Sequence, residues 1–183
     1  MAKRPAVDKI EFDPKRAVYL NGAVGPQSGW ETISGISKLY LEDPKTLIPL
    51  YVTTTGGSVS DAFAVYAYVT KLLKPILQTI ILGEASSSAV VLFMMGQRRY
   101  MDEMAVLRLH NFSFTFEQGT TLNVSKARKI ILDLEVSQGA YIDAIAKRSG
   151  GLASKKVLQD LMDKDAVILP DQALKLGLAH RIL

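Results

Sequence analysis

Short apolar runs alternate with segments of helical periodicity along nearly the whole chain. Strands are predicted over residues 17–20, 47–52, 77–82, 106–109 and 166–169, and the third of them stops at Gly83. The segments between them carry apolar residues at helical spacing. Strands that alternate with helices across short turns are typical of stacked βαβ units. The sequence therefore predicts an α/β fold with a mainly parallel sheet.

The same patterns define the helices and the extent of the domain. Periodicity predicts helices over residues 30–41, 58–74, 123–147, 154–162 and 170–176, whereas 89–95 fits a buried helix and a strand equally. Residues 111–116 show a period-2 strand pattern with Phe112, Phe114 and Phe116 on one face. No repeat or linker interrupts the chain. We expect a polar N-terminal segment over 1–15 and a single domain over 16–183.

Composition excludes several kinds of site. The chain has no cysteine and only two histidines, so it offers no thiol nucleophile or disulfide, and we expect neither a metal nor a cofactor. Its net charge of +4 comes from basic residues scattered along the chain, which disfavours nucleic acid as a partner. No apolar run is long enough for a signal peptide or a membrane span, so we expect no membrane partner and a cytoplasmic location.

Two strand-to-turn junctions end in small residues. Sites in open α/β sheets form at the carboxyl ends of strands. Gly56 and Gly57 follow one strand, and their backbone N–H groups are accessible to a reacting atom, although such pairs also mark plain turns. Residues 83–88 follow another strand and include three serines. A serine there is either a nucleophile at the start of a helix or only an N-cap residue, and the residues alone favour the cap.

A serine nucleophile needs a general base and a group that orients the base. His110 follows the strand at 106–109, whereas His180 lies near the C-terminus in a position that indicates the surface. Asp163, Asp165 and Asp171 near the last predicted strand are the candidates for the orienting carboxylate. Spacing alone does not choose among the three.

The chain resembles ClpP, the proteolytic subunit of the Clp protease, in four features that occur in the family's order. They are Gly56 with Gly57, the run 83–89, His110, and Lys164 with Asp165 followed by 170–177. The resemblance covers about residues 16–183. It implies Ser87 as the nucleophile, His110 as the base and Asp165 as the orienting carboxylate. It also implies that the backbone N–H groups of Gly57 and Ser88 form the oxyanion hole.

The resemblance implies a ClpP- and crotonase-like spiral of βαβ units with a protruding handle, made of a strand plus a long helix. It also implies a serine endopeptidase, acting on unfolded polypeptides or short peptides inside a ring-shaped homo-oligomer, typically two stacked heptamers. Residues 111–116 match the handle strand, so we expect their phenylalanines to pack against the long helix or a sister subunit.

Three departures affect the expected assembly. The family's Gln-Pro pair after the histidine is replaced by Asn111 and Phe112, and its arginine before the aspartate is Lys164. The N-terminal segment is short and lacks the family's recognisable stretch, which weighs against dependence on an ATP-driven unfoldase. These features resemble outlying ClpP-like proteins, including those that act on viral capsid precursors.

Two other functions fit parts of the pattern. The same fold would suit a crotonase-type enzyme acting on an acyl-CoA thioester, with Glu84 as the only acid beside the serine turn. A structural ring subunit with weak or lost turnover is the other alternative. The joint presence of Ser87, His110 and Asp165 favours the peptidase.

Overall fold

The structure is a computed structural model that describes residues 13–116 and 121–183. Within these ranges the centre is a seven-stranded sheet in which β1, β2, β3, β4 and β7 lie in that order, and β5 pairs with β3 and β6. The strands are β1 (Val18–Asn21), β2 (Ile48–Thr54), β3 (Leu77–Ser86), β4 (Arg98–Met101), β5 (Val106–Leu109), β6 (Ala166–Ile168) and β7 (Arg181–Ile182). Every pair is parallel except β5 with β6. The predicted α/β fold with a mainly parallel sheet is confirmed.

The sheet forks along β3. Residues 78–81 of this strand pair with β4, whereas residues 84–86 pair with β5. The prediction that the strand stops at Gly83 is therefore wrong, because a new neighbour takes over the hydrogen bonds of β3 beyond that glycine. One branch of the fork continues to β7 and the other to β6. The last residue of the longer strand, Ser86, is therefore the first of the three serines.

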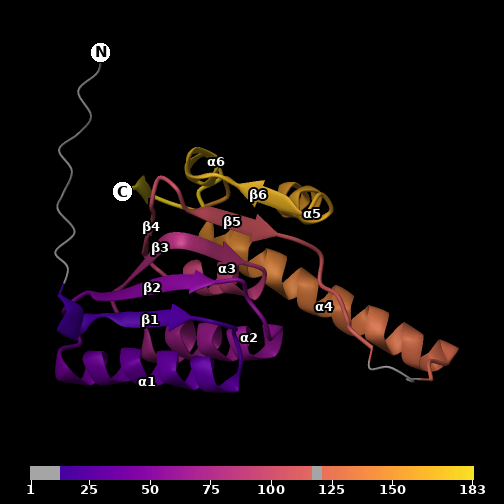
Figure 1. Cartoon of the computed structure of the whole chain (residues 1–183), viewed down its shortest axis with the longest axis horizontal. Helices are drawn as coiled ribbons and strands as arrows, with labels where there is room; N and C mark the ends of the chain where they lie inside the picture. The colour runs from indigo at the N-terminus through magenta and orange to yellow at the C-terminus, as the bar shows by residue number, and fades with distance from the viewer. Residues whose placement is uncertain (1–12, 117–120) are drawn as a thin grey trace, which may run out of the picture.

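Three helices cover one face of the sheet (Figure 1). They are α1 (Pro26–Glu42), α2 (Val59–Ala67), which continues as a π-helix (Tyr68–Leu73), and α3 (Ser88–Phe93). All six residues of α3 are buried, so the ambiguous stretch 89–95 begins as a core helix. Helix α1 starts earlier than predicted, with Pro26 in its first turn. Trp30, the first residue of the predicted helix, is 65% exposed, while Ile36 and Leu39 are buried.

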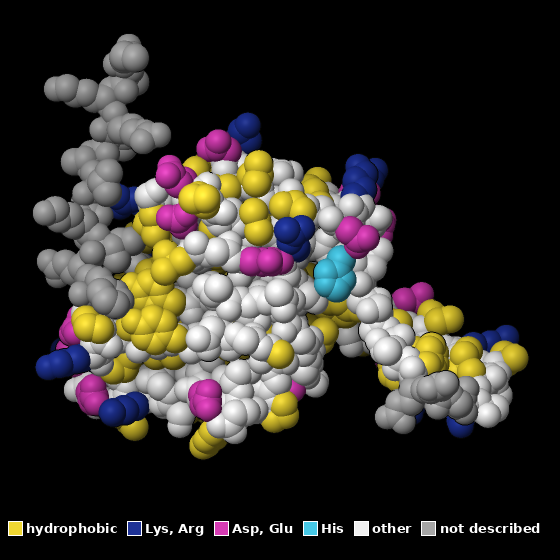
Figure 2. All heavy atoms as spheres, in the orientation of Figure 1, with side chains coloured by type: hydrophobic (Ala, Val, Ile, Leu, Met, Phe, Trp, Pro, Cys, Tyr) yellow, Lys and Arg dark blue, Asp and Glu magenta, His cyan; other side chains and the backbone are white. Residues whose placement is uncertain are grey.

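Helix α4 (Val124–Arg148) leaves the body of the molecule (Figure 1). The side chain of Asn123 caps its first turn by accepting from the N–H of Lys126. Toward its C-terminal end Tyr141 and Ile145 are buried, whereas the projecting part carries exposed hydrophobic side chains (Figure 2). These exposed residues are Val124, Ile131, Leu132 and Val136. Among the described residues no helix is long and apolar enough to cross a membrane.

The remaining helices, α5 (Lys155–Met162) and α6 (Pro170–Lys175), flank β6 in the chain. The N-terminal segment predicted over 1–15 lies mostly outside the described residues. Its last part forms a short 3-10 helix (Pro14–Arg16), whose N-cap is Asp13.

Residues 111–116 form no strand, contrary to the prediction. The N–H of Phe112 donates to the side chain of Gln138 on α4, at 2.9 Å, instead of to a neighbouring strand. Phe112 packs edge-on against Tyr141, with ring centroids 5.2 Å apart. Phe114 and Phe116 contact each other and stay about half exposed. Of the three phenylalanines expected to pack against the long helix or a sister subunit, only Phe112 packs against the long helix within this monomer.

Candidate active site

Ser87 stands at the junction between β3 and α3 with a backbone that non-glycine residues rarely adopt. Its φ and ψ are 56° and −127°. Such a conformation costs roughly 1–3 kcal/mol and persists only where the surroundings enforce it. Ser87 occupies the N-cap position of α3, yet its side chain makes no capping hydrogen bond. The capping role that the residues alone favoured is therefore wrong for this serine, and its hydroxyl is not committed to the helix.

Hydrogen bonds from three elements hold the backbone of Ser87. Its N–H donates to the carbonyl of Arg108 in β5 at 3.0 Å. Its carbonyl accepts from the N–H of Val90 in α3 at 3.1 Å and from the hydroxyl of Tyr141 in α4 at 2.7 Å. Both peptide groups that flank the serine are thus fixed, which explains how the strained conformation is maintained.

Gly56 lies directly against the serine turn. At its φ of +93°, a Cβ would come within 2.5 Å of the Ser86 carbonyl oxygen and 2.8 Å of the Ser87 Cβ. Only glycine permits this approach. The end of β2 and the end of β3 are also hydrogen-bonded neighbours, since Thr54 pairs with Ala85. The turn after β2 and the serine turn therefore form one continuous surface.

The two predicted oxyanion donors belong to this surface. Gly57 forms a bridge with Val24, whose hydrogen bonds run through the carbonyl of Gly56 and the N–H of Ser58. The N–H of Gly57 is left out of this bridge, and Ser88 is the first residue of α3, where N–H groups have no acceptor within the helix. Neither N–H donates a hydrogen bond to any other described residue. Both are available to a ligand.

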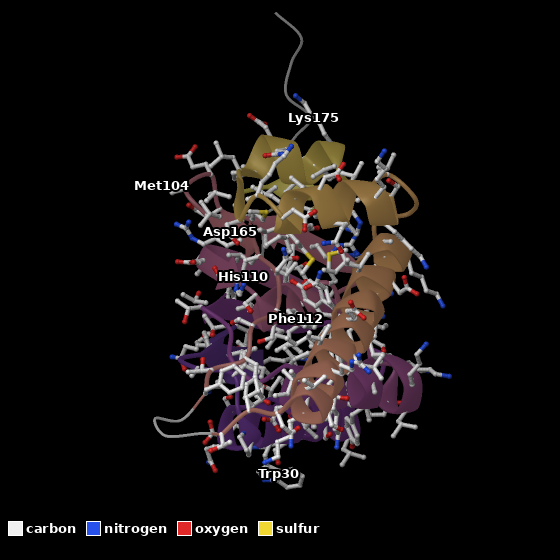
Figure 3. All side chains as sticks on the ribbon, turned by 90° about the vertical axis from the view of Figure 1, so that its right-hand side faces the viewer. Trp30, Met104, His110, Phe112, Asp165 and Lys175 are labelled. Carbon is white, nitrogen blue, oxygen red and sulfur yellow. The ribbon has the colours of Figure 1, made fainter. Side chains whose placement is uncertain are left out.

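His110 and Asp165 both lie at one end of the β5–β6 ladder. In this antiparallel pair Leu109 lies opposite Ala166 as the last pair, so His110 directly follows β5 and Asp165 directly precedes β6 at the same end of the ladder. Figure 3 shows the two residues side by side at this end of the sheet. Residues directly opposite in such a ladder have Cβ atoms about 5 Å apart. The register separates Asp165 from Asp171, which lies in the first turn of α6.

The three triad candidates are neighbours but are not hydrogen-bonded to one another in the described structure. The Nδ1 of His110 lies 2.8 Å from the carbonyl oxygen of Asn111, and Asp165 has a left-handed backbone with φ of 47°. His110 directly follows β5, and β5 runs beside the last residues of β3. The three predicted residues therefore lie at the neighbouring ends of β3, β5 and β6, without a hydrogen bond between them.

Asp163 is engaged elsewhere. Its carboxylate accepts from the side chain of Asn111 at 3.0 Å and from Gln159 at 2.7 Å, and Gln138 donates to Asn111 at 2.9 Å. The hydrogen bond from Asn111, and then the one from Gln159, hold the pKa of Asp163 below its ordinary value. This network ties the segment after His110 to α4 and α5. Of the two carboxylates in this loop, Asp163 is therefore the one that already has hydrogen-bond partners.

Tyr141 and Gln138 were missed as contributors to the site. The sequence placed both on the face of the long helix and assigned them no further role. They lie one turn apart, and they bond the backbone of Ser87 and of Phe112 respectively. Their polar groups stand among apolar residues of the long helix. Because buried polar groups require hydrogen-bond partners, this pattern could have indicated that the two residues bond to another part of the fold.

The acid and the second histidine considered in the sequence have other partners. Glu84 forms an ion pair with Arg108 at 2.8 Å and accepts from the hydroxyl of Ser86. His180 is exposed, as predicted, and its ring lies 2.8 Å from a guanidinium nitrogen of Arg99 in β4. His180 is thus on the other branch of the sheet, away from the serine turn.

Comparison with known proteins agrees with this geometry. A protein-family model described as "Clp protease" matches residues 8–183. Relatives from three strains of Dehalococcoides mccartyi are each named "ATP-dependent Clp protease proteolytic subunit". Each is 28% identical over 171 residues, which cover 92% of this chain and 82% of the relative.

Proposed function

The chain belongs to the Clp protease family, and on this premise we propose that it hydrolyses peptide bonds through a triad of Ser87, His110 and Asp165. Its class is that of the serine endopeptidases. The observation that carries the proposed triad is the strained backbone of Ser87, whose hydroxyl takes no part in capping the helix behind it. The ladder that aligns His110 with Asp165 supports the other two assignments.

In the proposed reaction His110 carries out every proton transfer. The hydroxyl oxygen of Ser87 attacks the scissile carbonyl carbon while His110 accepts the hydroxyl proton, and the C–N bond then breaks as His110 protonates the leaving amine. Water, activated by the same imidazole, hydrolyses the acyl-enzyme and restores the serine. Asp165 accepts a hydrogen bond from the imidazole and stabilises its protonated form.

The N–H groups of Gly57 and Ser88 would bind the oxyanion of the tetrahedral intermediate. Both are free of other acceptors among the described residues, as a preorganised donor pair must be. Ser88 begins a helix, so its N–H lies at the positive end of the helix dipole. Developing negative charge on the substrate oxygen is stabilised there without any rearrangement of solvent.

Formation of the proposed triad requires the imidazole of His110 to change its hydrogen-bond partner. The imidazole of His110 must exchange its contact with the Asn111 carbonyl for one with Asp165. Catalytic hydrogen bonds are often absent or long before substrate binds and form in the complex. The network from Asn111 to α4 and α5 holds the segment that follows His110.

We further propose a ring-shaped homo-oligomer built from a single peptidase domain over residues 16–183. The exposed apolar side chains on the projecting part of α4 support this proposal, because a large apolar patch on a monomer commonly marks an interface. The relatives are named proteolytic subunits of an ATP-dependent protease. For this chain the proposed substrates are unfolded polypeptides or short peptides, and no unfoldase is required for the short ones.

Turnover of a mixture of internally quenched fluorescent peptides tests the proposal. The purified oligomer, sized by native mass spectrometry, should cleave some of these peptides, and Ser87→Ala and His110→Ala should each abolish cleavage while keeping the native mass. Ser86→Ala is the matched control, because its hydroxyl bonds to Glu84 and not to the reacting groups. Cleavage that survives in Ser87→Ala would refute the triad, and an intact oligomer that cleaves nothing would refute the proposed activity.

A further inference from the structure

We infer that Tyr141 is a positioning residue that fixes the oxyanion hole through the carbonyl of Ser87. Its hydroxyl donates to this carbonyl oxygen at 2.7 Å. The inference rests on the proposed function, since it concerns the N–H of Ser88 as an oxyanion donor. Tyr141 itself touches neither substrate nor the reacting atoms.

The geometry of the peptide bond provides the link. The carbonyl of Ser87 and the N–H of Ser88 belong to the same planar trans peptide group, so they point in opposite directions within one plane. A hydrogen bond that fixes the direction of the carbonyl therefore fixes the direction of the N–H. Donation to the carbonyl also polarises the peptide group, which makes its N–H a stronger donor.

Tyr141 is held rigidly enough for this role. The residue is 1% exposed, and its ring packs edge-on against Phe112. Complete burial raises the pKa of its hydroxyl, so the group is protonated and able to donate at neutral pH. One turn earlier, Gln138 accepts from the N–H of Phe112. Helix α4 is thereby connected to both sides of the site.

Because the backbone of Ser87 is strained, the orientation of the next peptide group depends on hydrogen bonds from its surroundings. With a positive φ, the peptide after Ser87 has an orientation that the residue does not prefer by itself. The only other donor to its carbonyl among the described residues is the N–H of Val90, at 3.1 Å, within the same short helix. Tyr141 supplies the donor that comes from a separate element. Its loss would leave the orientation of the Ser88 N–H to a six-residue helix alone.

Tyr141→Phe removes the hydroxyl and keeps the ring, and the test compares two ligands on this variant. One is a peptide boronic acid, whose boron accepts the Ser87 oxygen and whose hydroxyl then occupies the oxyanion position. The other is the same peptide ending in an amide, which binds without forming this adduct. The ratio of the two affinities reports the oxyanion hole and is insensitive to the fraction of folded protein. It should fall about tenfold, the size of one net hydrogen bond, and kcat should fall in parallel at nearly constant KM.

Matched variants separate the hydroxyl from packing. Tyr68→Phe removes a hydroxyl that contacts the Ser37 hydroxyl at 3.2 Å, outside the site, and should keep the wild-type ratio. Phe112→Leu reduces the ring contact with Tyr141 but keeps the hydroxyl, so it should change the ratio much less than Tyr141→Phe.

Each remaining outcome is decisive. An unchanged ratio in Tyr141→Phe, an equal loss in Phe112→Leu, or failure of Tyr141→Phe to fold would overturn the positioning role. A Tyr141→Phe variant that does not fold would show that the Tyr141 hydroxyl contributes to stability and not to positioning. If the wild-type protein forms no adduct that depends on Ser87, the proposed function fails and the inference fails with it. An adduct that depends on Ser87 but not on Tyr141 overturns the inference only.

Discussion

His110 follows β5 and Asp165 precedes β6 at the same end of the β5–β6 ladder, yet the Nδ1 of His110 contacts the carbonyl of its own neighbour, Asn111, at 2.8 Å. The ladder therefore brings the proposed base and the proposed carboxylate to the same end of two paired strands, without a hydrogen bond between them. Asp163, two residues earlier, is already bonded to Asn111 and Gln159. This relationship distinguishes two nearby carboxylates, and substitution can test it.

Asp165→Asn should lower kcat/KM for peptide hydrolysis by about 10⁴-fold, because an amide favours the wrong imidazole tautomer and cannot stabilise the protonated ring. Asp163→Asn is the matched change in the same loop and should cost far less, since the amide can still accept from Asn111. Steady-state hydrolysis of one peptide by both variants provides the measurement. Equal losses, or a larger loss for Asp163→Asn, would contradict the assignment.

Gly56→Ala should disrupt the serine turn. The added Cβ would lie 2.5 Å from the carbonyl oxygen of Ser86, at a φ that alanine rarely adopts. We expect a loss of about 3 kcal/mol in stability from strain and overpacking together, and loss of reactivity at Ser87. Gly139→Ala is the control, because a Cβ there meets nothing within 4 Å on α4 and should stabilise by about 0.5–1 kcal/mol. Thermal unfolding should place Gly56→Ala below the wild type and Gly139→Ala above it, and a Gly56→Ala variant as stable as Gly139→Ala would contradict the prediction.

Arg99→Met should destabilise the fold without touching the site. The Arg99 side chain is buried, and its guanidinium donates to backbone carbonyls at the C-terminal ends of three helices. These carbonyls belong to Gly96, Arg148, Gly177 and Leu178. Burial, and then the charge of Arg148, lower the pKa of Arg99 to about 10, so it remains charged at neutral pH.

Loss of Arg99 would leave several buried carbonyls without a partner, at a cost of about 3 kcal/mol. Urea unfolding at a fixed protein concentration measures the change. Arg98→Met, at the exposed neighbouring position, should remain within about 0.5 kcal/mol of the wild type. Similar midpoints for Arg99→Met and the wild type would show that these carbonyls do not depend on the guanidinium.

His180 should make stability depend on pH. Partial burial of its ring, then the charges of Arg99 and Arg148, lower the pKa of His180 in the folded state. The unfolded chain therefore binds the proton at a higher pH than the folded chain. The contribution of neutral His180 is fully present above its unfolded pKa of about 6.5. It is lost as the pH falls through the lower folded value.

The unfolding midpoint of the wild type should accordingly decline on acidification from about pH 7 to about pH 5. His180→Gln removes the titrating group and should decline less over the same range. Urea unfolding at several pH values compares the slopes. A slope that is unchanged by the substitution would show that His180 carries none of this dependence.

Much of the sheet could be predicted because its strands are short apolar runs between turn residues. The positions of Gly57, Ser87 and His110 at strand ends followed from this pattern, since the carboxyl ends of parallel strands meet at one edge. The choice of Ser87 among three serines did not follow from the residues, and it came from the family resemblance. Even so, the backbone conformation of Ser87 is the feature that separates it from an ordinary cap.

The remaining features depend on contacts between residues distant in the chain. The fork at β3 arises because β5 replaces β4 as its neighbour, which no local pattern reveals. The strand β4 was missed because its arginines look like surface residues, whereas Arg99 is buried against carbonyls from residues 96, 148, 177 and 178. Residues 111–116 alternate like a strand, but Phe112 bonds to a side chain on α4.

The central claim is that Ser87 is the nucleophile, and intact-mass analysis after treatment with a fluorophosphonate tests it most directly. The folded wild-type oligomer and Ser86→Ala should each gain the mass of one adduct per chain, whereas Ser87→Ala should gain none. An adduct that persists in Ser87→Ala, or no adduct on a folded wild-type oligomer, would contradict the account.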